Sequence, residues 1–158
     1  MTNRYNTSDV TLLLVRLILA IVVGAHGAQK LLGWFGGYGF DGTINFFTDV
    51  IGLPYFLGLL IILLESVGMI ALLAGLLSRL ISAALILIMA GAIITTHMQH
   101  GFFMNWSGAS AGEGFEFHLL VIAQATVLLL NGGGTLSVDS RIKLKSKSKK
   151  IFWQLDWH

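Results

Sequence analysis

Four stretches of the chain are apolar over roughly the length that a helix needs to cross a bilayer, about 20 residues. They cover about residues 10–32, 53–77, 80–98 and 115–131. The last is near the lower limit for a span, at about 17 residues. The pattern predicts an all-α membrane protein whose four transmembrane helices form a bundle.

Glycine-rich segments separate or end these spans. The segment from Gly33 to Gly52 is rich in glycine and aromatic residues, so we expect it to lie at the membrane interface and to contain a short amphipathic helix from Thr43 to Ile51. Pro54 favours a helix start because its missing N–H needs no partner in a first turn. The short junction at Ser78-Arg79 predicts a hairpin of the second and third helices.

Composition supports a membrane protein. Of 158 residues, 55% are hydrophobic and only 11% are charged, whereas soluble domains have about 25% charged residues. The absence of cysteine excludes disulfides, thiolate metal sites and thiol redox chemistry in this chain. We expect one membrane domain, residues 1–140, and a basic tail, residues 141–158, that is either disordered or rests on anionic lipid.

Charge placement predicts the orientation. With four spans both termini share one side, and Arg4, Arg79, Arg141 and the tail lysines all fall on that side. The positive-inside rule therefore predicts that both termini are cytoplasmic. The first span is too long and too polar at Arg16 for a signal peptide, so we expect it to be retained. No nucleic-acid motif is present, and the basic excess in the tail indicates a membrane surface as its partner.

The first span has a polar face. Arg16, His26 and Lys30 fall within an arc of roughly 80° on a helix, and charges facing lipid are costly. This face should therefore turn toward the other helices. The side chains that can meet it there are Glu65, His97, Glu116 and His118.

Depth along the helices suggests pairs. At about 1.5 Å per residue, Arg16 lies roughly 9 Å, Glu65 roughly 18 Å and His26 roughly 24 Å above the inner ends of their helices. We therefore expect an intramembrane ion pair between Arg16 and Glu65, with a bond from His26 to Glu65 as the alternative. Glu116 and His118 point about 160° apart, and Gln124 favours Glu116 as the inward residue.

These residues predict a polar pocket in the outer half of the bundle. Its expected members are His26, Lys30, Glu65, His97 and Glu116. Histidines and carboxylates of this kind could bind and protonate a quinone headgroup. The alternative is that they only fix helix packing. The spacing of the histidines and carboxylates matches no specific metal or haem pattern, so we expect neither cofactor.

The order of motifs resembles the DoxX family of small four-helix bacterial membrane proteins. The resemblance rests on VRLILAIVVGAHGAQKLLGWFGG, ESVGMIALLAGLLSRL, GEGFEFHLL and NGGGTLSVD. It implies a multi-pass protein of the bacterial inner membrane, similar to a subunit of thiosulfate:quinone oxidoreductase. The family's characteristic positions correspond to Arg16, His26, Gly27, Lys30, Glu65, Gly75, Arg79, His97, Glu116 and Asp139.

The sequence thus leads to one main functional hypothesis and two alternatives. We expect a quinone-binding or accessory subunit of a membrane redox system, with a soluble or membrane redox partner. The alternatives are a non-catalytic membrane scaffold and a small-solute or proton carrier that uses Glu65. Small residues on the second and third helices permit a homodimer.

Overall fold

The computed structural model describes residues 7–143, and these form helices and connecting segments without a strand. Three helical segments are long and apolar enough to cross a membrane: Thr7–Leu32, Tyr55–Ala74 and Ser78–His100. A fourth apolar helix, Glu116–Asn131, is shorter. All four lie near their predicted ranges. Most of the basic tail, residues 144–158, lies outside the described residues.

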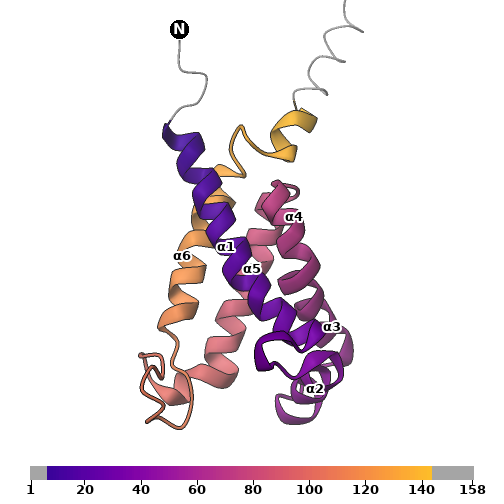
Figure 1. Cartoon of the computed structure of the whole chain (residues 1–158), viewed down its shortest axis with the longest axis vertical. Helices are drawn as coiled ribbons and strands as arrows, with labels where there is room; N and C mark the ends of the chain where they lie inside the picture. The colour runs from indigo at the N-terminus through magenta and orange to yellow at the C-terminus, as the bar shows by residue number, and fades with distance from the viewer. Residues whose placement is uncertain (1–6, 144–158) are drawn as a thin grey trace, which may run out of the picture.

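The first and the last of these four helices are regular. Helix α1 comprises Thr7–Leu32, and α6 comprises Glu116–Asn131. Gly132 directly follows the last residue of α6 and has a positive φ of 77°, a conformation that suits glycine. Both described ends of the chain lie at the same end of the bundle, at the top of Figure 1.

The other two long segments each contain a π-helical turn. Helix α3 (Tyr55–Leu63) continues through the π-helical segment η3 (Leu64–Gly68) into α4 (Met69–Ala74). Helix α5 (Ser78–Ala92) continues through the π-helical segment η4 (Ile93–His97) and a short 3₁₀ turn, η5 (Met98–His100). A turn at Gly75, with a φ of 73°, joins α4 to α5.

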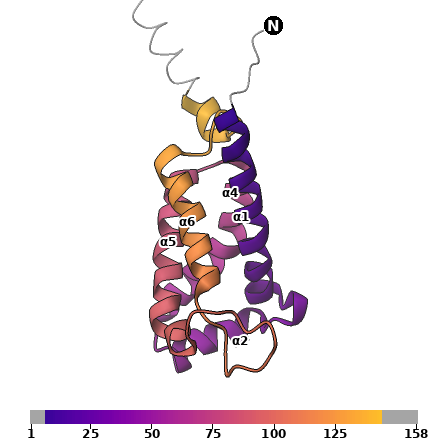
Figure 2. The same ribbon diagram turned by 90° about the vertical axis from the view of Figure 1, so that its left-hand side faces the viewer.

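The predicted helix between the first two spans is present and longer than expected. A 3₁₀ turn, η1 (Trp34–Gly36), precedes α2 (Gly39–Asn45), which continues as the π-helical segment η2 (Phe46–Val50). This helix lies at the end of the bundle opposite to the chain ends, as does the loop that precedes α6 (Figures 1 and 2).

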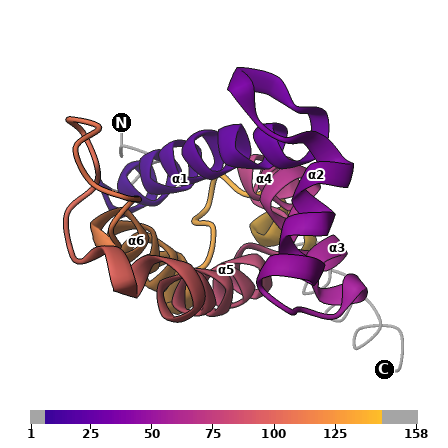
Figure 3. The same cartoon turned by 90° about the horizontal axis from the view of Figure 1, so that it is seen from below.

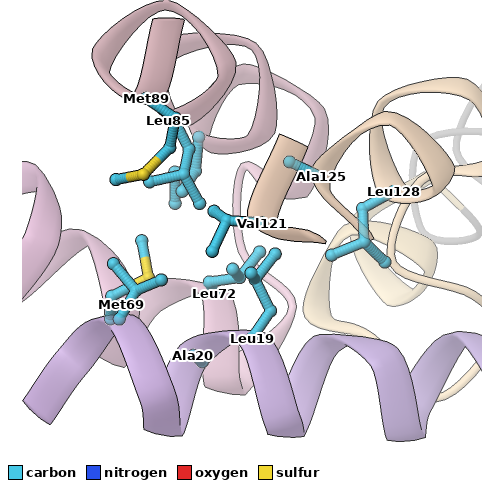
Figure 4. Close-up of a cluster of buried hydrophobic side chains, with 11 residues drawn as sticks. Leu19, Ala20, Met69, Leu72, Leu85, Met89, Val121, Ala125 and Leu128 are labelled. Atoms are coloured by element: carbon cyan, nitrogen blue, oxygen red, sulfur yellow. The ribbon is translucent and has the colours of Figure 1, made fainter. Parts of the chain in front are cut away.

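The apolar core lies where α1, α4, α5 and α6 meet. Figure 4 shows this cluster, in which side chains of all four helices converge. Leu72, Leu85, Ala125 and Leu128 have no exposed surface. Viewed from below, the four helices surround this region (Figure 3). The core separates two polar regions, one toward each end of the bundle.

Candidate functional site

A cavity of about 590 Å³ occupies the half of the bundle away from the chain ends. Its wall is largely apolar and comes from α1, η2, α3, η3, α5, η4 and α6. Val23 and Met89 of the core form part of this wall. Four of the five predicted pocket residues line the cavity: His26, Lys30, Glu65 and His97.

An ion pair links Lys30 of α1 to Glu65 of η3. The Glu65 side chain is 3% exposed and the Lys30 side chain 28% exposed. The carboxylate is therefore buried, whereas its lysine partner is only partly buried. A buried carboxylate needs such a partner, because an unpaired charge in the interior is costly. Glu65 therefore pairs with Lys30 instead of Arg16 or His26, which corrects both sequence predictions.

Gly27 allows this pairing. A Cβ at Gly27 would overlap the backbone carbonyl of Glu65, so only glycine lets α1 lie this close to η3. Lys30 follows Gly27 by three residues and therefore lies on the same face of α1. The close crossing brings the lysine within reach of the carboxylate.

Each π-helical segment of the described chain contributes to the cavity wall. Segment η2 supplies Phe46 and Phe47, and η3 supplies Leu64 and Glu65. Segment η4 supplies a run that ends in His97. A π-helical turn inserts an extra residue into a helix and is frequent at functional sites. Sequence periodicity did not indicate these turns, because hydropathy does not reveal a single inserted residue.

Two histidines face each other in the cavity wall. The ring centroids of His97 and His118 are 4.1 Å apart. His97 Nδ1 lies 2.8 Å from the carbonyl oxygen of Glu113, so this nitrogen carries the proton and donates it to that bond. His118 Nδ1 is buried and has no hydrogen-bond partner within residues 7–143. Because this atom is buried, a molecule in the cavity would meet the other ring nitrogens of the pair, His97 Nε2 and His118 Nε2.

His26 lies at the seam between α1 and α6. Its Nδ1 is 3.1 Å from Gln29 Oε1, and its ring centroid is 5.3 Å from that of Phe117. Phe117 and His26 both line the cavity. His26 is itself exposed, so this contact joins the two helices at the edge of the cavity without sealing it.

The prediction that Glu116 is the inward residue of α6 is wrong, because His118 takes that place. His118 is 7% exposed and lines the cavity. Glu116 Oε1 instead accepts hydrogen bonds from Met104 N at 3.1 Å and Trp106 Nε1 at 3.2 Å, and so holds the preceding loop. The buried stripe of α6 gives the signal that identifies His118: Val121, Ala125 and Leu128 follow it at helical spacing.

A second hollow of about 620 Å³ lies between the end of α1 and the α2–η2 helix. It shares Lys30, Phe46 and Phe47 with the cavity. Polar groups including Gln29, Asn45 and Asp49 line it. Lys30 thus lies at the boundary between the cavity and a hollow that contains several polar side chains.

Arg16 lies at the other end of the bundle, far along α1 from the cavity. It is 2% exposed, and its Nη1 and Nη2 donate to the carbonyl oxygens of Gly133 at 2.7 Å and Leu136 at 3.1 Å. These bonds hold the segment that follows α6 against the bundle. The depth estimate failed because it placed the helix ends level, whereas the first turns of α1 extend beyond the end of α4 (Figure 1).

Asp139 completes this end. Its two carboxylate oxygens accept hydrogen bonds from the backbone N–H groups of Leu77 and Ser78, both at 2.9 Å, at the start of α5. Burial alone would raise the pKa of the Asp139 carboxyl, but these bonds favour the charged form and hold the pKa below its usual value. Asp139 therefore acts as a remote cap of α5.

Among residues 7–143 no group of three histidine or acidic side chains is placed to hold a metal ion.

Comparison with known proteins gives a consistent result. The chain is 31% identical over 131 residues, 83% of its length and 86% of the relative's, to a protein of Bacillus subtilis (strain 168) named "Putative oxidoreductase CatD". No solved structure matches the chain. The family model named DoxX matches residues 11–98, more than half of the chain. Together with the relative, this match shows that the chain belongs to the DoxX family.

Proposed function

We propose that this protein binds a membrane quinone in the cavity and acts as a quinone-binding or accessory subunit of a redox system in the bacterial inner membrane. The cavity itself carries the proposal, because an apolar wall with a few convergent acid–base groups suits a quinone. The name of the Bacillus subtilis relative, an oxidoreductase, supports a redox role.

In this proposal the protein is a multi-pass bundle with α6 as its fourth span. Arg79, Arg141 and Lys143 lie at the same end as the described chain ends, so the positive-inside rule places that end in the cytoplasm. The cavity and the second hollow then lie in the outer half of the membrane.

The cavity residues supply the acid–base chemistry that a quinone requires. Reduction of a quinone to a quinol takes two electrons and two protons, one proton at each oxygen. Lys30, oriented by Glu65, can donate to one oxygen, and the His97–His118 pair can donate to the other. The electrons must come from a redox partner, because the chain has no cysteine that could supply them through thiol chemistry.

Protons can return to the cavity through Lys30. This side chain lines both the cavity and the second hollow, whose wall contains polar side chains. In the proposed orientation the hollow faces the outer aqueous phase, so an ammonium that has donated a proton can be reprotonated there.

The test is the quinone content of protein purified in mild detergent. We expect near-stoichiometric quinone in the native protein and little in a folded His26→Ala, Glu65→Gln double variant or in Lys30→Met. Asp139→Asn is the matched control, because it alters a carboxylate at the opposite end, and it should retain quinone.

Absence of quinone from the native protein, with no thermal stabilisation by added menaquinone, would overturn the proposal. That result would favour the scaffold. A pH-dependent flux in liposomes that Glu65→Gln abolishes, with no quinone bound, would favour the carrier.

A further inference from the structure

The cavity reaches the molecular surface between α3 and α5. Leu60 of α3 and Leu87 of α5 both line it, yet they are 58% and 73% exposed. Gly91, one turn beyond Leu87, also lines it, and a Cβ there would meet nothing within 4 Å. The cavity is therefore open on this side.

The path of the helices explains the opening. The turn at Gly75 holds the end of α4 close to the start of α5, and α5 then packs mainly along α6. Farther from this turn, α3 and α5 diverge, as Figure 1 shows. The gap lies at the level of the cavity, because Leu60 and Leu87 on its two sides both line the cavity.

We propose that this opening is a lateral portal to the bilayer, and that the ligand is a quinone with a long isoprenoid tail that lies between α3 and α5. The inference rests on the proposed function and defines its substrate class. Both helices belong to segments long enough to span the membrane, so the surface between them faces hydrocarbon.

The positions of polar and apolar residues in the cavity wall indicate how the quinone is oriented. The donors belong to α1, η4 and α6, whereas the portal is flanked by leucines. If the quinone headgroup lies at Lys30 and the histidines, the apolar tail of the quinone points toward Leu60 and Leu87.

The experiment compares two quinones in nanodiscs. Menaquinone-4 carries an isoprenoid tail, and 2,3-dimethyl-1,4-naphthoquinone has the same type of headgroup without it. Association rates are measured by quenching of tryptophan fluorescence for the native protein and for Gly91→Phe, which places a ring in the portal. Ala123→Phe is the matched control, since Ala123 is exposed on α6 and does not line the cavity.

We expect Gly91→Phe to slow association of menaquinone-4 at least tenfold and to change that of the tailless quinone less than twofold. Ala123→Phe should change neither rate. Leu87→Trp, at an exposed position, is a second portal variant that should behave like Gly91→Phe even where the latter folds poorly.

Two results would overturn the inference in distinguishable ways. If the native protein binds both quinones and neither portal variant slows menaquinone-4, the portal is wrong while quinone binding stands. If the native protein binds neither quinone, the proposed function fails, and the portal fails with it.

Discussion

The two polar ends of the bundle use buried charge differently. At the end with the chain ends, Arg16 donates to the carbonyl oxygens of Gly133 and Leu136, and Asp139 accepts from the backbone of Leu77 and Ser78. At the other end, the charge of Glu65 is met by Lys30 beside an open cavity. At the first end, charged side chains bind backbone atoms of the same protein. At the second end, charged side chains line the cavity.

This difference separates structural from functional polar groups. A charge that is committed to backbone atoms holds segments in place and has little capacity left for a ligand. Groups that line a cavity, such as Lys30 and His97, face a space that a ligand can occupy. Substitutions at the two ends should therefore have different consequences for stability and for binding.

The largest loss of stability is expected for Arg16→Met. The substitution leaves one buried and one partly buried carbonyl oxygen without a donor, so the free energy of unfolding should fall by about 3 kcal/mol. Unfolding in detergent with increasing SDS, followed by tryptophan fluorescence, measures it. Ile18→Met, at an exposed position of the same helix, should change stability little. An Arg16→Met protein of native stability would contradict the structural role.

Gly27→Ala should affect both stability and the site. The added methyl group overlaps the carbonyl of Glu65, so we expect a loss of about 2 kcal/mol from overpacking together with loss of bound quinone. At Gly24 a Cβ would lie 3.4 Å from the Met69 Cβ, an ordinary contact, so Gly24→Ala is the control and should keep both properties. Retained quinone in Gly27→Ala would show that the close crossing is not needed.

The smallest effect is expected for Asp139→Asn, and it should depend on pH. The folded-state pKa of Asp139 is depressed, so its stabilisation is fully present above the unfolded pKa and is lost as the pH falls through the folded pKa. At pH 7 the variant should be less stable by about 1 kcal/mol, as for a lost helix cap.

The difference in stability between the native and Asp139→Asn proteins should begin to shrink below about pH 4, near the pKa of an unfolded aspartate. It should vanish once the pH is below the folded pKa of Asp139. Unfolding curves between pH 3 and 7 measure this. Asp41→Asn, at an exposed position of α2, serves as the control and should show no such convergence. A difference that persists unchanged at low pH would contradict a charge-dependent cap.

The sequence correctly predicted the helices, the long apolar spans and the family, and it identified most residues of the candidate site. It predicted the wrong partner for Glu65 because its depth estimate took the ends of the spans as level. Gly27 lies beside Glu65, and Arg16 lies beside Gly75, so the first nine residues of α1 extend past the end of α4. The offset between two helices depends on their packing and is not encoded in either helix alone.

The inward residue of α6 was wrong for a related reason. Glu116 and Gln124 suggested a polar inward face, but the loop from Gly101 to Phe115 folds back and provides Glu116 with its own donors. This leaves the face of His118 to the cavity. The orientation and the bound quinone remain predictions, and the quinone content of the purified protein tests the second.

The sequence by itself determined the α-helical architecture and the capacity to span a membrane, because helix formation and hydropathy depend on residues close together in the chain. It also identified Arg16 and Glu65 as ionisable residues that need buried partners. Only the tertiary structure decided which partners they have and where the cavity opens. These depend on the offsets between helices, the π-helical turns and the approach of α1 to η3 at Gly27, which arise when distant segments pack together.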